Sequence, residues 1–137
     1  MKLGDSLSAD EAMVELAFEP VIHDLVASGY TAELGNLTGR ASDGQLLTEL
    51  TVNAQTLGPL TVDPGASDAE RVRNAAYFVQ DRLLESRTDN GSAVVWPVCR
   101  PGHGHPQELT PPGPGWPAWT CPREPGWDVS VGHLSEN

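Results

Sequence analysis

The uneven distribution of residue types along the chain is the feature that most limits how it can fold. Of its 137 residues, the last 42 contain all four tryptophans, both cysteines, three of the four histidines and nine of the twelve prolines. The preceding 95 residues contain ordinary periodic patterns of apolar and polar side chains. Because the composition changes near Gly91-Ser92, we expect an acidic α+β domain over residues 1–92 and a Pro/Trp-rich Cys/His module over residues 93–137.

Two Ser-x-x-Glu sequences, at residues 8–11 and 67–70, predict where helices begin. An apolar stripe at helical spacing follows the first as far as Gly29, a typical helix stop. Pro20 lies inside this stripe, so it either kinks the helix or begins a second one. The predicted apolar face of the helix after residue 67 consists of Val72, Ala75, Ala76, Val79 and Leu83.

Strands are predicted at residues 30–34 and 45–52, joined through the turn-forming pair Asp43-Gly44, and at residues 60–62. In the C-terminal module, residues 93–96 and 127–131 have the pattern of further strands. The expected fold class is therefore α+β: a small antiparallel sheet packed by two or three helices, with a C-terminal zinc-ribbon-like β module.

The strongest chemical signal is a group of candidate metal ligands, Cys99, His103, His105 and Cys121. Two thiols and two imidazoles are the ligand set of a closed tetrahedral zinc site, and small modules with few aliphatic residues often need such a cross-link. The spacing differs from the Cys-x2-Cys repeat of a standard ribbon. The sequence therefore predicts a structural zinc site with one uncertain position, for which Glu124 or His133 is a substitute.

Three alternatives to a metal site stay open at this point. Cys99 and Cys121 could form a disulfide, which a cytosolic setting disfavours, or could be buried as small apolar residues. The His-Gly-His sequence at residues 103–105 could be a surface loop without a ligand role. A catalytic metal, with three protein ligands and an open position, is the remaining alternative. His23 lies in a helical pattern and is expected to be structural or on the surface.

The tryptophans divide into two predicted roles. Trp96 and Trp119 lie beside the cysteines in segments of strand-like pattern, so we expect them to form the module's core. Trp116 is flanked by Gly115 and Pro117, and it is the candidate for an exposed, partner-binding aromatic residue.

The C-terminal motifs resemble those of a set of small uncharacterised actinobacterial proteins. The relevant sequences are Trp-Pro-Val-Cys at residues 96–99, His-Pro at 105–106 and Trp-Thr-Cys-Pro at 119–122. Those proteins have a Trp-Pro-x-Cys-Pro…His…His-Pro…Trp-x-Cys-Pro pattern behind an acidic α/β region. The resemblance covers roughly the last 80 residues and implies a cytosolic, metal-binding protein. Arg100 departs from the pattern, which has proline after the first cysteine.

The net charge of −11 limits the classes of partner. An acidic chain is a poor ligand for nucleic-acid phosphates or for an anionic membrane surface, so we expect neither. No apolar run approaches the length of a membrane span, and the N-terminus lacks the apolar region of a signal peptide. The expected location is the cytoplasm.

The function expected from these features is a non-catalytic acidic module that binds a basic protein partner. An immunity or antitoxin-like inhibitor is the specific form of this hypothesis. The nucleotide-binding loops, the nucleophile elbow and the His-Glu-x-x-His helix are all missing from the sequence. The alternative is a small zinc-dependent metalloenzyme that uses the Cys/His site.

Overall fold

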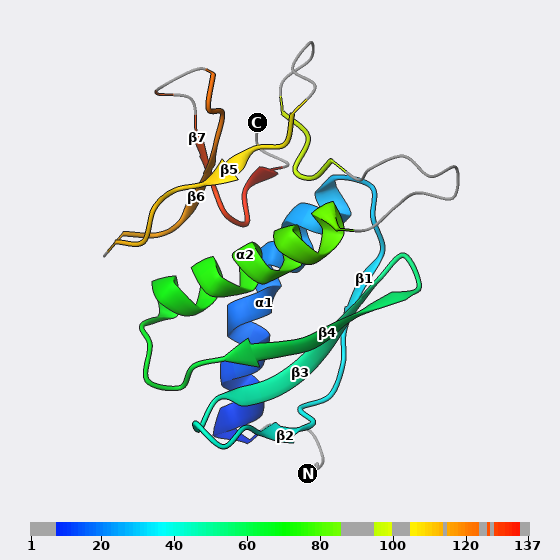
Figure 1. Cartoon of the computed structure of the whole chain (residues 1–137), viewed down its shortest axis with the longest axis vertical. Helices are drawn as coiled ribbons and strands as arrows, with labels where there is room; N and C mark the ends of the chain where they lie inside the picture. Colours follow the sequence, from blue (N-terminus) through cyan, green and yellow to red (C-terminus); the bar gives the residue numbers. More distant parts are fainter. Residues whose placement is uncertain are drawn as a thin grey trace.

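The computed structural model describes residues 8–85, 95–99, 105–113, 115–123, 126 and 128–134. This part of the chain contains two helices and two small antiparallel sheets (Figure 1), which confirms the predicted α+β fold. In chain order the elements are α1 (Ala9–Ala27), β1 (Ala32–Leu34), β2 (Gly39–Arg40), β3 (Leu46–Val52), β4 (Gln55–Val62), α2 (Asp68–Leu84), β5 (Glu108–Leu109), β6 (Ala118–Thr120) and β7 (Asp128–Ser130).

Helix α1 is one helix that continues through Pro20. It begins with the predicted capping box, in which the Ser8 hydroxyl accepts the Glu11 amide and the Glu11 carboxylate accepts the Ser8 amide, both at 3.1 Å. Gly29, with φ of +94°, follows its last turn as predicted. The alternative in which Pro20 begins a second helix is wrong, because side chains before and after the proline are buried in the same core. These buried residues are Val14, Ala17, Phe18, Val21, Asp24 and Leu25.

Helix α2 matches its sequence pattern closely. Ser67 caps it, and hydrogen bonds from the backbone and side chain of Ser67 lower the pKa of Glu70. The buried residues of the helix are the five that the periodicity predicted, Val72, Ala75, Ala76, Val79 and Leu83. The apolar stripe therefore identified the core-facing side of this helix correctly.

Strand β3 is the centre of the larger sheet and pairs antiparallel with β1, β2 and β4. The Asp43-Gly44 turn joins β3 to the short strand β2, and not directly to the strand predicted at residues 30–34; Gly44 has the positive φ (+89°) that such a turn requires. The turn between β3 and β4 is also tight. Its central residues Asn53 and Ala54 both have positive φ, +49° and +67°, which is the pattern of a type I′ turn. Strand β4 consequently extends further back than the predicted strand at residues 60–62.

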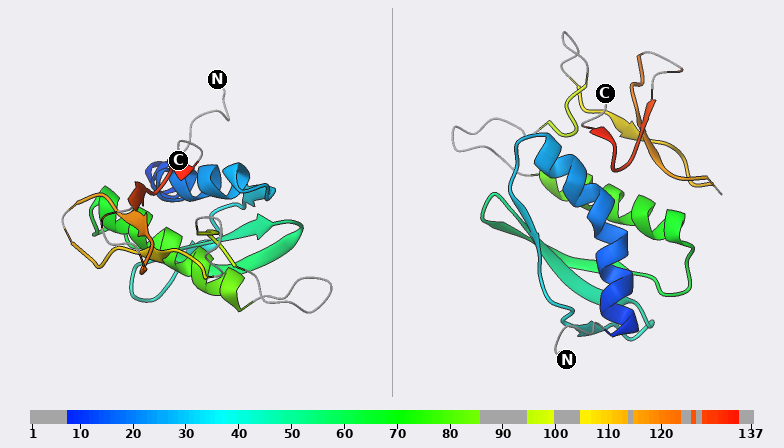
Figure 2. Two further views of the ribbon diagram at one scale, coloured as in Figure 1. Left: turned by 90° about the horizontal axis from the view of Figure 1, so that it is seen from above. Right: turned by 180° about the vertical axis from the view of Figure 1, so that it is seen from behind.

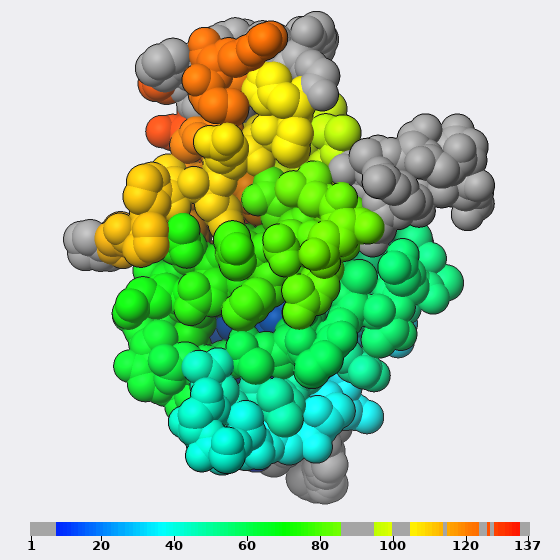
Figure 3. Space-filling model, in the orientation of Figure 1, coloured from blue at the N-terminus to red at the C-terminus, as the bar shows by residue number. Residues whose placement is uncertain are grey.

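Both helices cover the same face of this sheet, with α1 beside β1 and α2 beside β4 (Figures 1 and 2). The second sheet, in the order β5-β6-β7, lies beyond the C-terminal end of α1 and alongside α2 (Figure 1). We call the described residues from 95 to 134 the C-terminal segment. In Figure 3 its yellow to orange part lies directly against α2. Within the described residues, none of the helices has the length and apolar character needed to cross a membrane.

The C-terminal segment contributes to the same apolar core as the helices. Trp96 and Trp119 are completely buried and meet edge to face, with ring centroids 5.1 Å apart and an interplanar angle of 75°. Their predicted core role is confirmed. The strand predicted at residues 127–131 is found as β7, whereas Val95 and Trp96, the described part of the strand predicted at 93–96, lie in no strand. The boundary predicted near Gly91-Ser92 lies outside the described residues.

Asp24, near the end of α1, is completely buried and holds the C-terminal segment against the helix. Its Oδ2 accepts hydrogen bonds from the Trp119 indole (2.8 Å) and the Gly132 amide (2.7 Å), and its Oδ1 accepts the Leu134 amide (3.0 Å). Such charge-assisted bonds offset the cost of removing a carboxylate from water. Gly132 suits this position, since its φ is +102° and an added Cβ would lie only 3.0 Å from the Cβ of Pro20.

Replacing Asp24 by Asn should destabilise the fold, because the amide NH2 group cannot accept the hydrogen bonds that one carboxylate oxygen receives. We expect Asp24→Asn to lower the free energy of unfolding by about 2–3 kcal/mol, measured by urea denaturation. Asp81→Asn is the matched control, since the Asp81 side chain is 43% exposed on α2. Its effect should stay within about 0.5 kcal/mol. Equal effects of the two substitutions would contradict the anchoring role of Asp24.

Candidate metal centre

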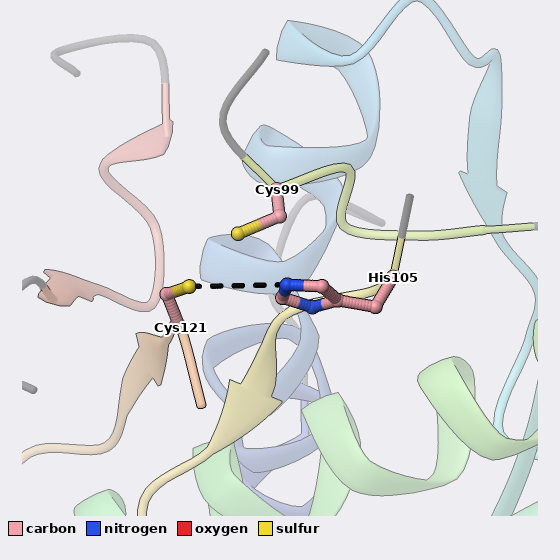
Figure 4. Close-up of side chains that lie close together, drawn as sticks. All are labelled: Cys99, His105 and Cys121. Carbon is pink, nitrogen blue, oxygen red and sulfur yellow. Dashed lines mark hydrogen bonds between the residues drawn. The ribbon is translucent and has the colours of Figure 1, made fainter. Parts of the chain in front are cut away.

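Cys99, His105 and Cys121 form a compact cluster in the C-terminal segment (Figure 4). One ligand atom from each residue lies within 4.8 Å of the others, and the Cys121 Sγ to His105 Nε2 distance is 4.0 Å. Both cysteines are buried and His105 is half-buried. These three residues therefore lie close enough to hold a metal ion.

Backbone pairing brings the three residues together. An isolated antiparallel bridge joins Val98 to Pro106, which places Cys99 and His105 on adjacent stretches of chain. Cys121 directly follows β6, and β6 pairs with β5, which begins three residues after His105. Each candidate ligand is thus fixed at the end of a paired segment.

Hydrogen bonds of two glutamines, Gln80 and Gln107, hold this arrangement on α2. Gln80, on α2, donates from Nε2 to the carbonyls of Trp96 (3.2 Å) and Gln107 (2.6 Å). Gln107 is 2% exposed and donates from Nε2 to the Val98 carbonyl (2.9 Å). Its Oε1 is buried and accepts no hydrogen bond from the described residues. The sequence did not predict the role of either glutamine, because nothing in the local pattern distinguishes an amide that bonds a distant segment from one that faces solvent.

The orientation of His105 directs one ring nitrogen, Nε2, toward the sulfur of Cys121. Its Nδ1 lies 3.0 Å from the Pro106 carbonyl oxygen. A carbonyl can only accept, so Nδ1 must carry the hydrogen of this bond, and the lone pair of the neutral ring is then on Nε2. That is the nitrogen that faces Cys121. Backbone carbonyls commonly orient metal-binding histidines in this way.

The chemistry of the three groups favours a thiophilic cation. In a tetrahedral zinc site, bonds of about 2.0–2.3 Å place neighbouring ligand atoms roughly 3.4–3.8 Å apart. The ligand atoms of the cluster lie within 4.8 Å of one another, so a bound zinc ion would draw them together by up to about 1 Å. Two thiolates at such distances would repel one another. A cation bound between them would attract both and so offset this repulsion.

The other predicted ligands have different outcomes. His103 and the substitute Glu124 lie outside the described residues. His133 is described and exposed, and it is not a member of the cluster. The two cysteines are not joined by a disulfide in this structure. His23 is half-exposed, as expected of a surface histidine, with its Nδ1 3.7 Å from Asp24 Oδ1.

Trp116 is 48% exposed, as the sequence predicted. Its indole donates to the Val131 carbonyl (3.0 Å), which helps to dock the end of the chain. It also lines a cavity of about 120 Å³ together with Leu16, which is 62% exposed, and Val72. The role of Trp116 in binding a partner stays a prediction.

Comparison with protein-family models, with curated proteins and with solved structures found no match for this chain. The resemblance to actinobacterial proteins therefore stays a prediction, and the site has to be interpreted from its own geometry.

His105 is the candidate ligand whose contribution can be tested against a matched histidine, His23. We expect the purified chain to bind Co²⁺ with the thiolate charge-transfer absorption of a sulfur-ligated site. His105→Ala should lower the affinity by at least roughly tenfold, whereas His23→Ala should leave it unchanged. Unchanged Co²⁺ affinity in His105→Ala would remove His105 from the ligand set.

Proposed function

We propose that the chain is a non-catalytic protein-interaction module whose C-terminal segment is cross-linked by a structural zinc ion, and that it binds a basic protein partner. The convergence of Cys99, His105 and Cys121 is the observation that supports the zinc site most directly. Sulfur and imidazole together favour zinc over the hard cations magnesium and calcium, which take oxygen ligands.

A structural role fits the location of the ligands better than a catalytic one. Both sulfurs are buried, and the three ligands join separate stretches of a segment whose strands are only two or three residues long. Strands this short have little stability alone, so a cross-link between them contributes directly to folding. Among the described residues, no carboxylate belongs to the cluster where a general base would be needed.

The fourth ligand of the proposed site is His103, which completes a two-cysteine, two-histidine set. This proposal rests on ligand type and on its position two residues before His105. The resulting site is ribbon-like in ligand chemistry, while its spacing differs from two Cys-x2-Cys knuckles.

The charge distribution supports the proposed partner. Nine of the eleven net negative charges fall in residues 1–95, which contain 15 acidic and 6 basic side chains. Such a surface attracts a basic protein from a distance and speeds its association. In the immunity or antitoxin-like form of the proposal, carboxylates of this surface occupy the basic cleft of a nuclease or another toxin.

Metal removal should separate a structural zinc from a catalytic one. We expect freshly purified protein to contain one zinc per chain and a chelator to lower the melting temperature. Hydrogen exchange should then increase around Cys99, His105 and Cys121 before it increases in β3. A zinc-free purified protein would contradict the zinc proposal. Unchanged melting after complete metal removal would contradict the structural role and favour the metalloenzyme.

The partner proposal predicts capture that depends on salt. Full-length protein used as bait in a lysate of its source organism should retain basic proteins at 0.1 M salt and release them near 1 M, where the screening length falls from about 10 Å to about 3 Å. An unrelated bait of the same net charge is the control. Retention of the same proteins by both baits, or retention that does not depend on salt, would contradict a specific basic partner.

A further inference from the structure

A groove of about 330 Å³ lies between α1 and the chain that joins β1 to β2. These two segments run side by side along one edge of the molecule (Figure 2, right). The α1 side of the groove presents Glu11, Glu15 and Glu19, which recur every four residues and therefore lie along one line of the helix. Val14 and Ile22 supply apolar surface between and beyond them.

The opposite side of the groove is apolar and has a fixed shape. Leu34 and Leu37 line it, and both are partly buried against the core. Between these two leucines the backbone leaves its regular pairing with β3. The buried Thr48 hydroxyl instead donates a hydrogen bond to the Asn36 carbonyl (3.2 Å). Backbone bonds from Gly35 to Glu49 and from Thr38 to Leu47, each 2.8 Å, fix the two ends of this stretch. The groove therefore exists before any ligand binds.

The part of the chain that the structure describes supplies no cation to the carboxylates at the rim. Among the described residues no ion pair involves Glu11, Glu15 or Glu19, and Arg40, a cation near this end of α1, is paired with Asp10 at 2.7 Å. Like charges one helical turn apart repel one another, so the groove combines an apolar floor with uncompensated negative charge. A ligand that supplies cations and an aliphatic side chain satisfies both features.

We propose that this groove is the docking site for an extended basic segment of the partner, with Lys or Arg side chains on Glu15 and Glu19 and an aliphatic side chain against Leu34 and Leu37. Two residues of extended chain span about 6.6 Å, close to the roughly 6 Å between successive glutamates on the helix. Alternate basic residues therefore match the line of carboxylates. This inference rests on the basic partner proposed above and adds where and how that partner is recognised.

Selection from a random dodecapeptide library displayed on phage tests the docking site without a known partner. The full chain is used as bait beside two variants of equal charge change. Glu15→Gln/Glu19→Gln alters the groove, and Glu108→Gln/Asp128→Asn removes two exposed carboxylates from the C-terminal sheet. We expect enriched peptides with two or more basic residues and an aliphatic residue. Their binding should fall at least tenfold in the groove variant and less than twofold in the control variant.

A second pair of variants tests the apolar floor. Leu37→Asn should weaken the selected peptides at least fivefold, while Leu84→Asn, which changes a leucine that is 39% exposed at the end of α2, should not. Circular dichroism and melting temperature establish that each variant is folded before its binding is compared.

Other results of the peptide selection would contradict the docking site, the basic partner or both. Basic peptides that lose affinity equally in both charge variants would overturn the groove while leaving an acidic interaction surface. A selection that enriches no basic peptides would overturn both the groove and the basic partner. The chain could instead dimerise in solution, and Leu37→Asn could abolish the dimer. That result would assign the groove to a second copy of the chain and overturn the proposal.

Discussion

The carboxylate of Asp24 is the contact on which the arrangement of the two halves of the chain depends. It is completely buried, and it accepts hydrogen bonds from three donors that all belong to the C-terminal segment. A buried carboxylate is strongly unfavourable unless it is paired, so α1 and this segment stabilise one another reciprocally. The helix supplies the charge, and the segment supplies the Trp119 indole and two backbone amides.

The candidate metal centre is built on this contact. Cys121 lies two residues after Trp119, so both side chains emerge on the same side of the extended chain. Cys99 lies three residues after Trp96, whose indole donates to Ser28 at the end of α1 (3.1 Å). The two tryptophans meet edge to face in the core, so the chain segments that lead to the two cysteines are packed against each other. A metal ion at the cluster would therefore close a framework that is already positioned by the tryptophans.

The features that could be predicted from the sequence are those that depend on residues close together along the chain. Both capping boxes and the buried face of α2 depend on residues within a few positions of one another. Cys99, His105 and Cys121 were predicted as ligands because of their distinctive chemistry, although spacing alone left one position of the site uncertain, with Glu124 or His133 as substitutes. Asp24 could not be predicted, because its partners lie 95 to 110 residues further along the chain. The turn at Asn53 and Ala54 was missed because alanine rarely adopts positive φ.

Helix α1 connects two sites of different chemistry. Its 19 residues extend for about 28 Å, with the glutamates of the groove between its third and eleventh residues and Asp24 in the last two turns. Separation along the helix keeps negative charge in the groove away from the cysteine sulfurs, which must lose protons to bind a metal. It also means that loss of the metal would loosen the C-terminal segment at one end of α1 while the walls of the groove, formed by the other end and by β1 to β2, keep their contacts. The groove and the segment that contains the three candidate metal ligands therefore depend on different contacts of α1, although both are part of one core.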